Sequence, residues 1–450
     1  MSKSSKSRQA IVIIHGIGEQ RPMDTLRAFV KTLQGFPSAG EATRVWNKPD
    51  KVSAGFEHRT LSLSATRTRP QTDVYELYWA HLANPSEEPT FTSWLISLFR
   101  RNPDLLPPRF RKVQKIGLIA LVSGMILAIW AGRALPLDAT LAALITLPLS
   151  GLLLSGIGYW LTGVYRGKIV DISRYFDSHP KNVQARNEVR KLGVDFLRGL
   201  HESPRRYGRI VVCGHSIGSA IGYDILQKLW FEMHETHKQL DCPKRDAKKA
   251  LRRAIKNEDW SNIQTLQAEV FDEQLSAGNP WLVTDFVTLG SPLAHGDLLL
   301  ASSLAAFRER LTDGELARCP PVLDLGAQQI GFMRKYQIEG GDYRSIELLP
   351  HHALFAVTRW TNIYFSRRFW LFGDPIAGPL KDVFGPGIRD VVVQGGGYWP
   401  RIRHNDYWRS DLPLAKKLVG GASYPLDALD DALRLDPVQK EMNSSDLPEN

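Results

Sequence analysis

One string in the sequence has the residue types and spacing of an activated serine. Residues 211–220 read VVCGHSIGSA, which places Ser216 in a Gly-x-Ser-x-Gly pattern between Gly214 and Gly218. A β-branched run precedes the pattern and a helical run follows it, and this strand–turn–helix context presents a nucleophilic serine at a sharp turn. Side chains at the two flanking positions would collide with neighbouring backbone, so glycine is needed there. A bare match in 450 residues arises by chance with a likelihood of roughly 0.2, so the flanking elements carry the prediction.

A second glycine-rich turn could bind the negative charge that develops when a serine attacks a carbonyl. Residues 15–18 read HGIG and follow the short apolar run 11–14. An oxyanion hole needs backbone N–H groups aimed at one point, and one of them belongs to the residue after the nucleophile. We therefore expect the amides of Ile217 and Ile17 to form the hole, although an ordinary glycine turn is the alternative for residues 15–18. The residues expected to support the two turns are His15, Gly16, Gly18, Gly214 and Gly218.

A serine nucleophile also needs a base, and a carboxylate that orients the base. In this arrangement they follow the serine in the order acid, then histidine. Asp374 comes just after the strand-like run 359–364, and His404 is the only histidine after Asp374. Most lone loop histidines are simply exposed, but the order rule and the aromatic residues after His404 favour a role as base. Asp297 and Asp324 are weaker candidates for the acid because they lie earlier, near helical patterns.

The remaining chemistry-bearing residues suggest no metal and no cofactor. His215 is fixed in the turn beside the serine, and we expect it to point the wrong way to act as the base. His295 follows a strand end that we expect to line the pocket, so we expect it to be a pocket or packing residue. The three cysteines, Cys213, Cys242 and Cys319, exclude a disulfide scaffold and a thiol cluster for zinc. There is no His-Glu-x-x-His, no P-loop lysine and no Gly-x-Gly-x-x-Gly that opens a helix.

Alternating strand and helix patterns would position these residues. This alternation predicts an α/β fold with a doubly wound, mostly parallel sheet. The expected strands are 10–15, 73–79, 209–213, 281–289, 353–364 and 388–394. The clearest expected helices are 24–33, 185–200 and 219–233.

Two uncharged apolar stretches, 116–131 and 141–161, interrupt this alternation. A bilayer-spanning helix needs about 20 apolar residues, so we predict an inserted transmembrane hairpin with helices at about 116–132 and 141–161. A buried hairpin in a soluble core is the alternative. Basic residues flank the pair on both sides, while the only charged residues of the short link between the two stretches are Arg133 and Asp138. The positive-inside rule then predicts a two-pass membrane protein with its catalytic domain in the cytoplasm.

The net charge of +10, from 57 Lys and Arg against 47 Asp and Glu, suggests an anionic partner. No zinc-finger, basic-zipper or RNA-binding aromatic pattern occurs, so we expect a membrane surface and no nucleic acid. Residues 238–256 contain eight basic and two acidic residues. They predict either a solvated helical excursion or a cap that rests on anionic lipid.

We expect the following organisation: a flexible N-terminus (1–9), a first hydrolase segment with the oxyanion loop (10–90), the membrane hairpin insertion (91–175), the nucleophile segment (176–237), a charged helical cap or excursion (238–275), a segment with the acid and histidine (276–435) and a flexible tail (436–450).

Taken together, these residues resemble the α/β-hydrolase family, in particular its lipase-like and esterase-like members. The resemblance covers about residues 10–79 and 209–408 and rests on 15–18, 214–218, the strand end 286–293 (FVTLGSPL), Asp374 and His404. It implies a serine hydrolase of carboxylic esters, with lipid esters expected, in which Ser216 attacks, His404 takes the proton and Asp374 orients the imidazole. No cofactor is implied. The inserted hairpin departs from the typical soluble member, and a thioesterase, an amidase or an inactive membrane-tethered scaffold are the alternatives.

Overall fold

A computed structural model describes most of the α/β part of the chain. The described residues are 8–16, 21–36, 43–53, 59–66, 69–82, 111, 115, 119, 122, 175–176, 180–237, 246–322, 330–337, 341–366, 373–374, 376–395, 403–409 and 421–435. The chain divides into two compact units, of which the first comprises Met1–Asn84, Gln184–Gly296 and Glu309–Asn450. The second comprises Pro85–Val183 and Asp297–Arg308. The first unit contains the main sheet and the predicted catalytic residues.

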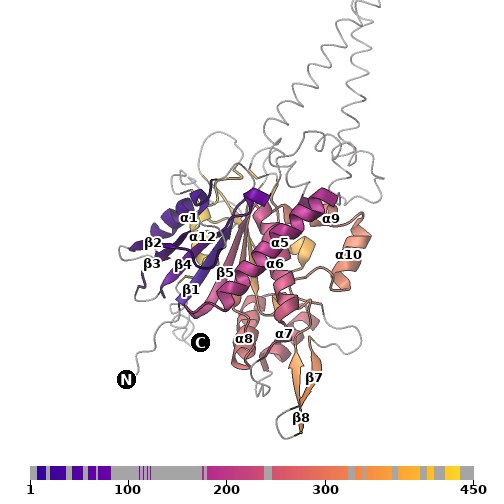
Figure 1. Ribbon diagram of the computed structural model, residues 1–450. Coiled ribbons are helices and arrows are strands. Elements are labelled where there is room, and N and C mark those ends of the chain that lie inside the picture. Colours follow the sequence, from indigo (N-terminus) through magenta and orange to yellow (C-terminus); the bar gives the residue numbers. More distant parts are fainter. Residues whose placement is uncertain are drawn as a thin grey trace, which may run out of the picture. The chain divides into compact units, whose positions relative to one another are not determined.

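The first unit is built on an eight-stranded sheet with the order β10-β9-β6-β5-β1-β4-β3-β2. Figure 1 labels its strands β1 to β5. The six strands from β10 to β4 are parallel, whereas β3 and β2 are antiparallel at one edge. The strands are β1 (Arg8–Ile14), β2 (Val45–Pro49), β3 (Arg59–Leu63), β4 (Thr72–Leu77), β5 (Tyr207–His215), β6 (Val283–Leu289), β9 (Arg359–Phe365) and β10 (Arg389–Val393). The predicted mostly parallel α/β sheet is confirmed, and its six parallel strands are the six that the sequence predicts.

Several strand limits differ from the prediction. β1 begins at Arg8, and β6 begins only at Val283. The predicted strand 353–364 is wrong in its first part, because Leu354–Ala356 forms a 3₁₀ turn (η5) before β9 begins at Arg359. The antiparallel strands β2 and β3 were not predicted. β2 shows no alternation of buried apolar and exposed polar residues, because this edge strand is mostly exposed.

The α-helices of the described residues are α1 (Asp24–Gln34), α5 (Pro180–His201), α6 (Ile217–Met233), α7 (Asp246–Lys256), α8 (Ile263–Ser276), α9 (Gly296–Leu299), α10 (Leu304–Thr312), α11 (Lys381–Phe384) and α12 (Pro425–Leu433). Within the first unit, α1 and α12 cover one face of the sheet and α6 covers the other. Two further 3₁₀ turns are η2 (Ala80–Leu82) and η4 (Pro292–His295), and a separate antiparallel hairpin joins β7 (Phe332–Gln337) to β8 (Tyr343–Leu348).

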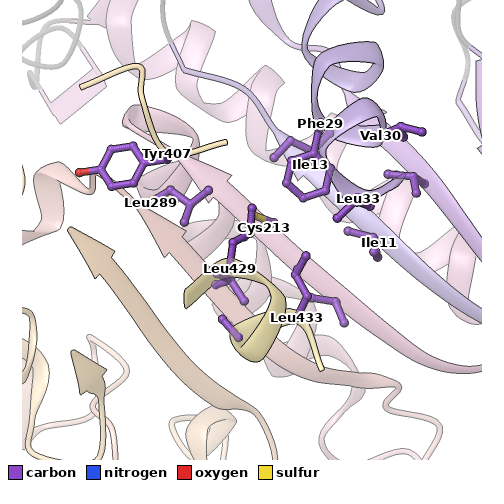
Figure 2. Packing of buried hydrophobic residues seen from close by; sticks show 14 of the residues in the cluster. Ile11, Ile13, Phe29, Val30, Leu33, Cys213, Leu289, Tyr407, Leu429 and Leu433 are labelled. Atoms are coloured by element: carbon purple, nitrogen blue, oxygen red, sulfur yellow. The ribbon is translucent and has the colours of Figure 1, made fainter. Parts of the chain in front are cut away.

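Side chains that alternate along the strands divide the core between the two faces. Ile11 and Ile13 of β1 pack with α1 and α12 in one apolar cluster (Figure 2). Ile14, the residue after Ile13, approaches α6 on the opposite face, where its Cδ1 would lie 3.3 Å from a Cβ added at Gly222. Because both faces are covered, residues 10–14 of β1 are continuously apolar instead of alternating with polar residues.

The charged region after α6 forms two helices. Lys248 of α7 is 5 % exposed and its ammonium lies 3.4 Å from Glu347 of β8 and 3.9 Å from Glu273 of α8. Leu251 is fully buried on the same helix. In chain order, α7 and α8 follow the C-terminal end of α6, whereas Ser216 precedes its first residue. The basic residues of this region therefore do not all face outward.

The two apolar stretches predicted to form the membrane hairpin lie outside the described residues, apart from Ile119 and Val122, which are helical and exposed. In the ranges that the structure does describe, no helix is long and apolar enough to cross a membrane. The described residues thus give the hairpin no support, and it remains a prediction of the sequence.

Candidate active site

Ser216 lies at the sharp turn between β5 and α6. Its backbone has φ 53° and ψ −128°, a region that residues other than glycine rarely adopt. The turn is held by a hydrogen bond from the Ser216 amide to the Leu289 carbonyl (2.9 Å) and by two from Ser219 to the Ser216 carbonyl. Such backbone strain persists only where the surrounding structure enforces it, and it clusters at functional sites.

The two glycines of the pattern make this turn possible. A Cβ at Gly214 would lie 2.5 Å from the Cα of Ser219. A Cβ at Gly218 would lie 2.3 Å from the Ile14 carbonyl oxygen and 2.5 Å from that of His15. All of these are backbone atoms, so no side-chain rotation could relieve the overlap. Helix α6 can therefore begin directly against the end of β1 only with glycine at these positions.

The structure brings Ser216, His404 and Asp374 into one hydrogen-bonded chain. The Nε2 atom of His404 lies 2.8 Å from Ser216 Oγ, and its Nδ1 atom lies 2.8 Å from Asp374 Oδ2. The three side chains come from positions 188 and 30 residues apart along the chain. All three residues are buried, with at most 3 % of their surface exposed.

The environment of Asp374 keeps its carboxylate charged. Burial alone would raise its pKa, but the nearby imidazole of His404 and hydrogen bonds from His404, Tyr407 and the Ile376 amide bring the pKa below its ordinary value. Oδ1 accepts the amides of Ile376 (3.0 Å) and Ala377 (3.3 Å). An ionised carboxylate can only accept hydrogen bonds. Nδ1 of His404 must therefore carry the proton, which leaves Nε2 free to accept the proton of Ser216.

The loop that carries His404 is held against its neighbours through the main chain. The Arg403 amide donates to the Gly373 carbonyl (2.8 Å), which joins the histidine loop to the acid loop. The Nε2 atom of His215 lies 2.8 Å from the His404 carbonyl oxygen and must donate to it. As expected from the sequence, His215 is no base for Ser216, yet it contributes by holding the backbone of His404.

Only part of the expected oxyanion hole lies within the described residues. Ile217 is the first residue of α6, where an amide has no partner within the helix and the helix dipole favours negative charge. Gly16 approaches the nucleophile, since a Cβ there would lie 3.0 Å from the Cβ of Ser216. Ile17 and Gly18 lie outside the described residues.

His15 supports this side of the site as a neutral side chain. Its Nε2 accepts the Trp79 amide (3.3 Å), so Nδ1 donates to the Gly16 carbonyl (2.7 Å). Burial lowers the pKa of His15 to about 4. Its ring stacks on the Trp79 indole at 5.3 Å between centroids. A neutral His15 thus fixes the backbone just before the predicted oxyanion loop.

The remaining residues weighed in the sequence are Asp297, Asp324 and His295. Asp324 lies outside the described residues, Asp297 lies in α9 and His295 in η4. Among the side chains that the structure describes, no group of three His, Cys, Asp or Glu residues could hold a metal ion.

Two residues of the site were not predicted from the sequence. Tyr407 donates its hydroxyl to Asp374 Oδ2 (2.7 Å), and the hydroxyl oxygens of Ser291 and Ser219 lie 2.7 Å apart behind the turn. The only signal for Tyr407 was its place in the aromatic string after His404. Ser291 belongs to the strand end 286–293, whose pattern indicates no role for this hydroxyl.

No protein family, curated protein or solved structure matches this chain. The chemistry therefore has to be inferred from geometry. The arrangement comprises a strained serine, a base hydrogen-bonded to it, and a charged carboxylate that orients the base. This arrangement suits nucleophilic attack on a carbonyl carbon followed by proton transfer to a leaving group.

Proposed function

We propose that this chain is a serine hydrolase of the α/β-hydrolase type that cleaves carboxylic esters through an acyl-enzyme. The observation that carries the proposal is the hydrogen-bonded chain Asp374–His404–Ser216, with 2.8 Å at each of its two links. Its position at the carboxyl ends of β5 and neighbouring parallel strands is where α/β folds bind ligands.

In the proposed reaction, Ser216 Oγ attacks the ester carbonyl while Nε2 of His404 takes its proton. The Ile217 amide, together with that of Ile17, stabilises the oxyanion. His404 then protonates the leaving alcohol, and the serine ester remains. A water molecule, deprotonated by the same Nε2, attacks this ester and releases the acid and free Ser216. Asp374 stabilises the imidazolium in both steps without taking its proton.

The proposed substrate is a lipid ester, and the proposed location is a membrane with the catalytic unit in the cytoplasm. This part rests on the sequence of the two apolar stretches, 116–131 and 141–161, and on the basic residues that flank them. A tether beside the bilayer raises the effective concentration of a substrate dissolved in it. Carbonate extraction of membranes tests the tether, because release of the protein into the supernatant contradicts spanning helices.

The catalytic proposal is tested by covalent labelling. A fluorophosphonate probe should label the full-length protein in detergent, and S216A should abolish the label. S62A is a matched control, because it removes another buried serine hydroxyl, one that donates to Asp73 (2.5 Å) outside the triad. The control should label like the wild type. A folded wild-type protein that is neither labelled nor able to hydrolyse short-chain and long-chain acyl esters would overturn the proposal.

A further inference from the structure

The carboxylate of Asp374 has a second donor on the oxygen that faces His404. Oδ2 accepts both Nδ1 of His404 (2.8 Å) and the hydroxyl of Tyr407 (2.7 Å). Neither Asp374 nor Tyr407 reaches solvent, with 0 % and 1 % of their surfaces exposed. Because the carboxylate only accepts, the direction of the tyrosine hydrogen bond is determined: the phenol donates.

The hydroxyl of Tyr407 is itself held from the sheet. The amide of Phe365, the last residue of β9, donates to it (3.3 Å), so a chain of donors runs from the strand through the phenol to the acid. Successive hydrogen bonds of this kind polarise one another. In Figure 2 the hydroxyl of Tyr407 points away from the labelled apolar side chains. The ring of Tyr407 therefore packs in the apolar core, whereas its hydroxyl oxygen lies in the candidate active site.

Gly290 leaves the space in which the phenol and the carboxylate meet. Its φ is +61°, and a Cβ there would lie 2.7 Å from Tyr407 Cε2 and 2.9 Å from Asp374 Oδ2. A glycine directly after β6 therefore leaves the room that the Tyr407 ring and the Asp374 carboxylate occupy. A tyrosine that served only to fill the core would not require its hydroxyl to approach the acid in this way.

We propose that Tyr407 is a positioning residue of the triad. Its hydroxyl holds Asp374 Oδ2 in line with His404 and, as a hydrogen-bond donor, reduces the effective negative charge of the carboxylate beside the imidazole. The inference rests on the proposed function, since it assigns a role within the same site. The hydroxyl of Tyr407 is hydrogen-bonded to Asp374 and to the Phe365 amide, so its effect on the reaction passes through Asp374.

The phenol remains a donor throughout the working pH range. Burial and the charge of Asp374 raise the pKa of Tyr407 well above its ordinary value. The other titratable or charged groups around the pair are His404, His215, whose ring lies 5.9 Å from that of Tyr407, and the Arg403–Asp406 pair. Removing the hydroxyl leaves all of these groups in place.

Y407F tests the proposal because it deletes the hydroxyl and keeps the ring. We expect kcat to fall about tenfold, as for loss of a hydrogen bond to a charged acceptor, with KM within about twofold. With one donor fewer, the carboxylate holds the imidazolium proton more tightly, so the acid limb of the kcat/KM profile should move up by about 0.5 pH unit. A purely structural role would lower the melting temperature and leave the pH profile unchanged.

Y223F is the matched control. Tyr223 is equally buried at 1 % exposure, and its hydroxyl donates to the Ala317 carbonyl (2.9 Å) away from the triad. This variant should lose stability without a shift of the pH profile. If Y407F keeps the wild-type kcat and pH profile, the role of Tyr407 is overturned while the hydrolase proposal stands. If the wild type itself is not labelled at Ser216, it is the hydrolase proposal that fails.

Should Y407F fail to fold, site-specific 3-fluorotyrosine at position 407 provides the second measurement. The fluorinated phenol is a stronger donor, so the acid limb should move to lower pH. An unchanged profile in that variant overturns the proposal equally.

Discussion

Replacing Asp374 by asparagine tests the candidate site most sharply, because the carboxylate and the carboxamide have nearly the same shape. Four donors surround the native carboxylate. Two are the backbone amides of Ile376 and Ala377 on Oδ1, and two are His404 and Tyr407 on Oδ2. A carboxamide has only one acceptor oxygen. Its NH₂ group must therefore face one of these pairs of donors.

The surroundings decide which way the amide turns. If the NH₂ group faced Ile376 and Ala377, two buried amides that cannot become acceptors would lose their partner, at about 1–3 kcal/mol each. If it faces His404 and Tyr407, the phenol can rotate to accept and the imidazole can change tautomer. We therefore expect the second orientation. Nδ1 of His404 then accepts, the proton moves to Nε2, and Ser216 faces a donor instead of a base.

The expected loss results from this change of tautomer. A correctly placed histidine in the wrong tautomer loses on the order of 10⁴ in kcat, or about 5 kcal/mol of transition-state stabilisation. The oxyanion donors should leave a residual rate above that in water. The assay is steady-state ester hydrolysis at neutral pH together with the rate of fluorophosphonate labelling, with circular dichroism to show that D374N is folded.

D390N is the matched control. The Asp390 carboxylate accepts the amides of Leu380 and Lys381 and the side chain of Asn362, and it is not part of the triad. This variant should lose stability and keep the rate per folded molecule. A folded D374N that retains more than about a tenth of the wild-type kcat would refute the tautomer argument, and an equal loss in D390N would assign the effect to general destabilisation.

Two further outcomes concern the scaffold. G218A should lower the unfolding free energy by about 2–3 kcal/mol and abolish labelling, because its Cβ meets the carbonyl oxygens of Ile14 and His15. G222A in the same helix meets only side-chain carbons, of which the nearest is Phe286 Cε2 at 3.0 Å, so it should stay folded and active in the same denaturation and labelling assays. Equal behaviour of the two variants would contradict the packing argument. Burial lowers the pKa of both His15 and His201 to about 4, so the unfolded chain takes up protons first as the pH falls. Above pH 6.5 each buried neutral histidine contributes fully to the free energy of unfolding. As the pH falls towards 4 this contribution is lost, at about 3 kcal/mol per group. Urea unfolding at several pH values should therefore show a shallower acid-side loss in H201F, and an unchanged slope would disprove this assignment.

Much of the fold could be predicted because its parallel strands carry their own local signal. Strands buried on both faces need continuous β-branched runs, and such runs mark β1, β5 and β6 in the sequence. The edge strand β2 lacks this signal, because an exposed antiparallel edge tolerates polar residues such as Asn47 and Lys48. The neighbouring β3 is mostly buried, yet its sequence RTLSL contains no β-branched run. β3 pairs with β4, and β2 pairs with β3; no local pattern encodes either pairing.

The candidate site likewise has a part that local sequence patterns predict and a part that depends on the tertiary structure. The turn at Ser216 is local, since its glycines, strand and helix lie within about ten residues and their steric needs can be deduced from the string alone. The order of acid and histidine along the chain narrowed the other two members to Asp374 and His404. The sequence by itself thus determined which residues are candidates.

Only the tertiary structure decided that these candidates meet. The contact between His404 and Ser216 joins residues 188 positions apart, and it depends on the order of the strands and on two loops being held together by the Arg403–Gly373 hydrogen bond. The hydroxyl of Tyr407 reaches Asp374 because Gly290, on a third segment, leaves room for it. Distances of this kind arise from the packing of the whole sheet and its loops, whereas sequence patterns report only the neighbours along the chain.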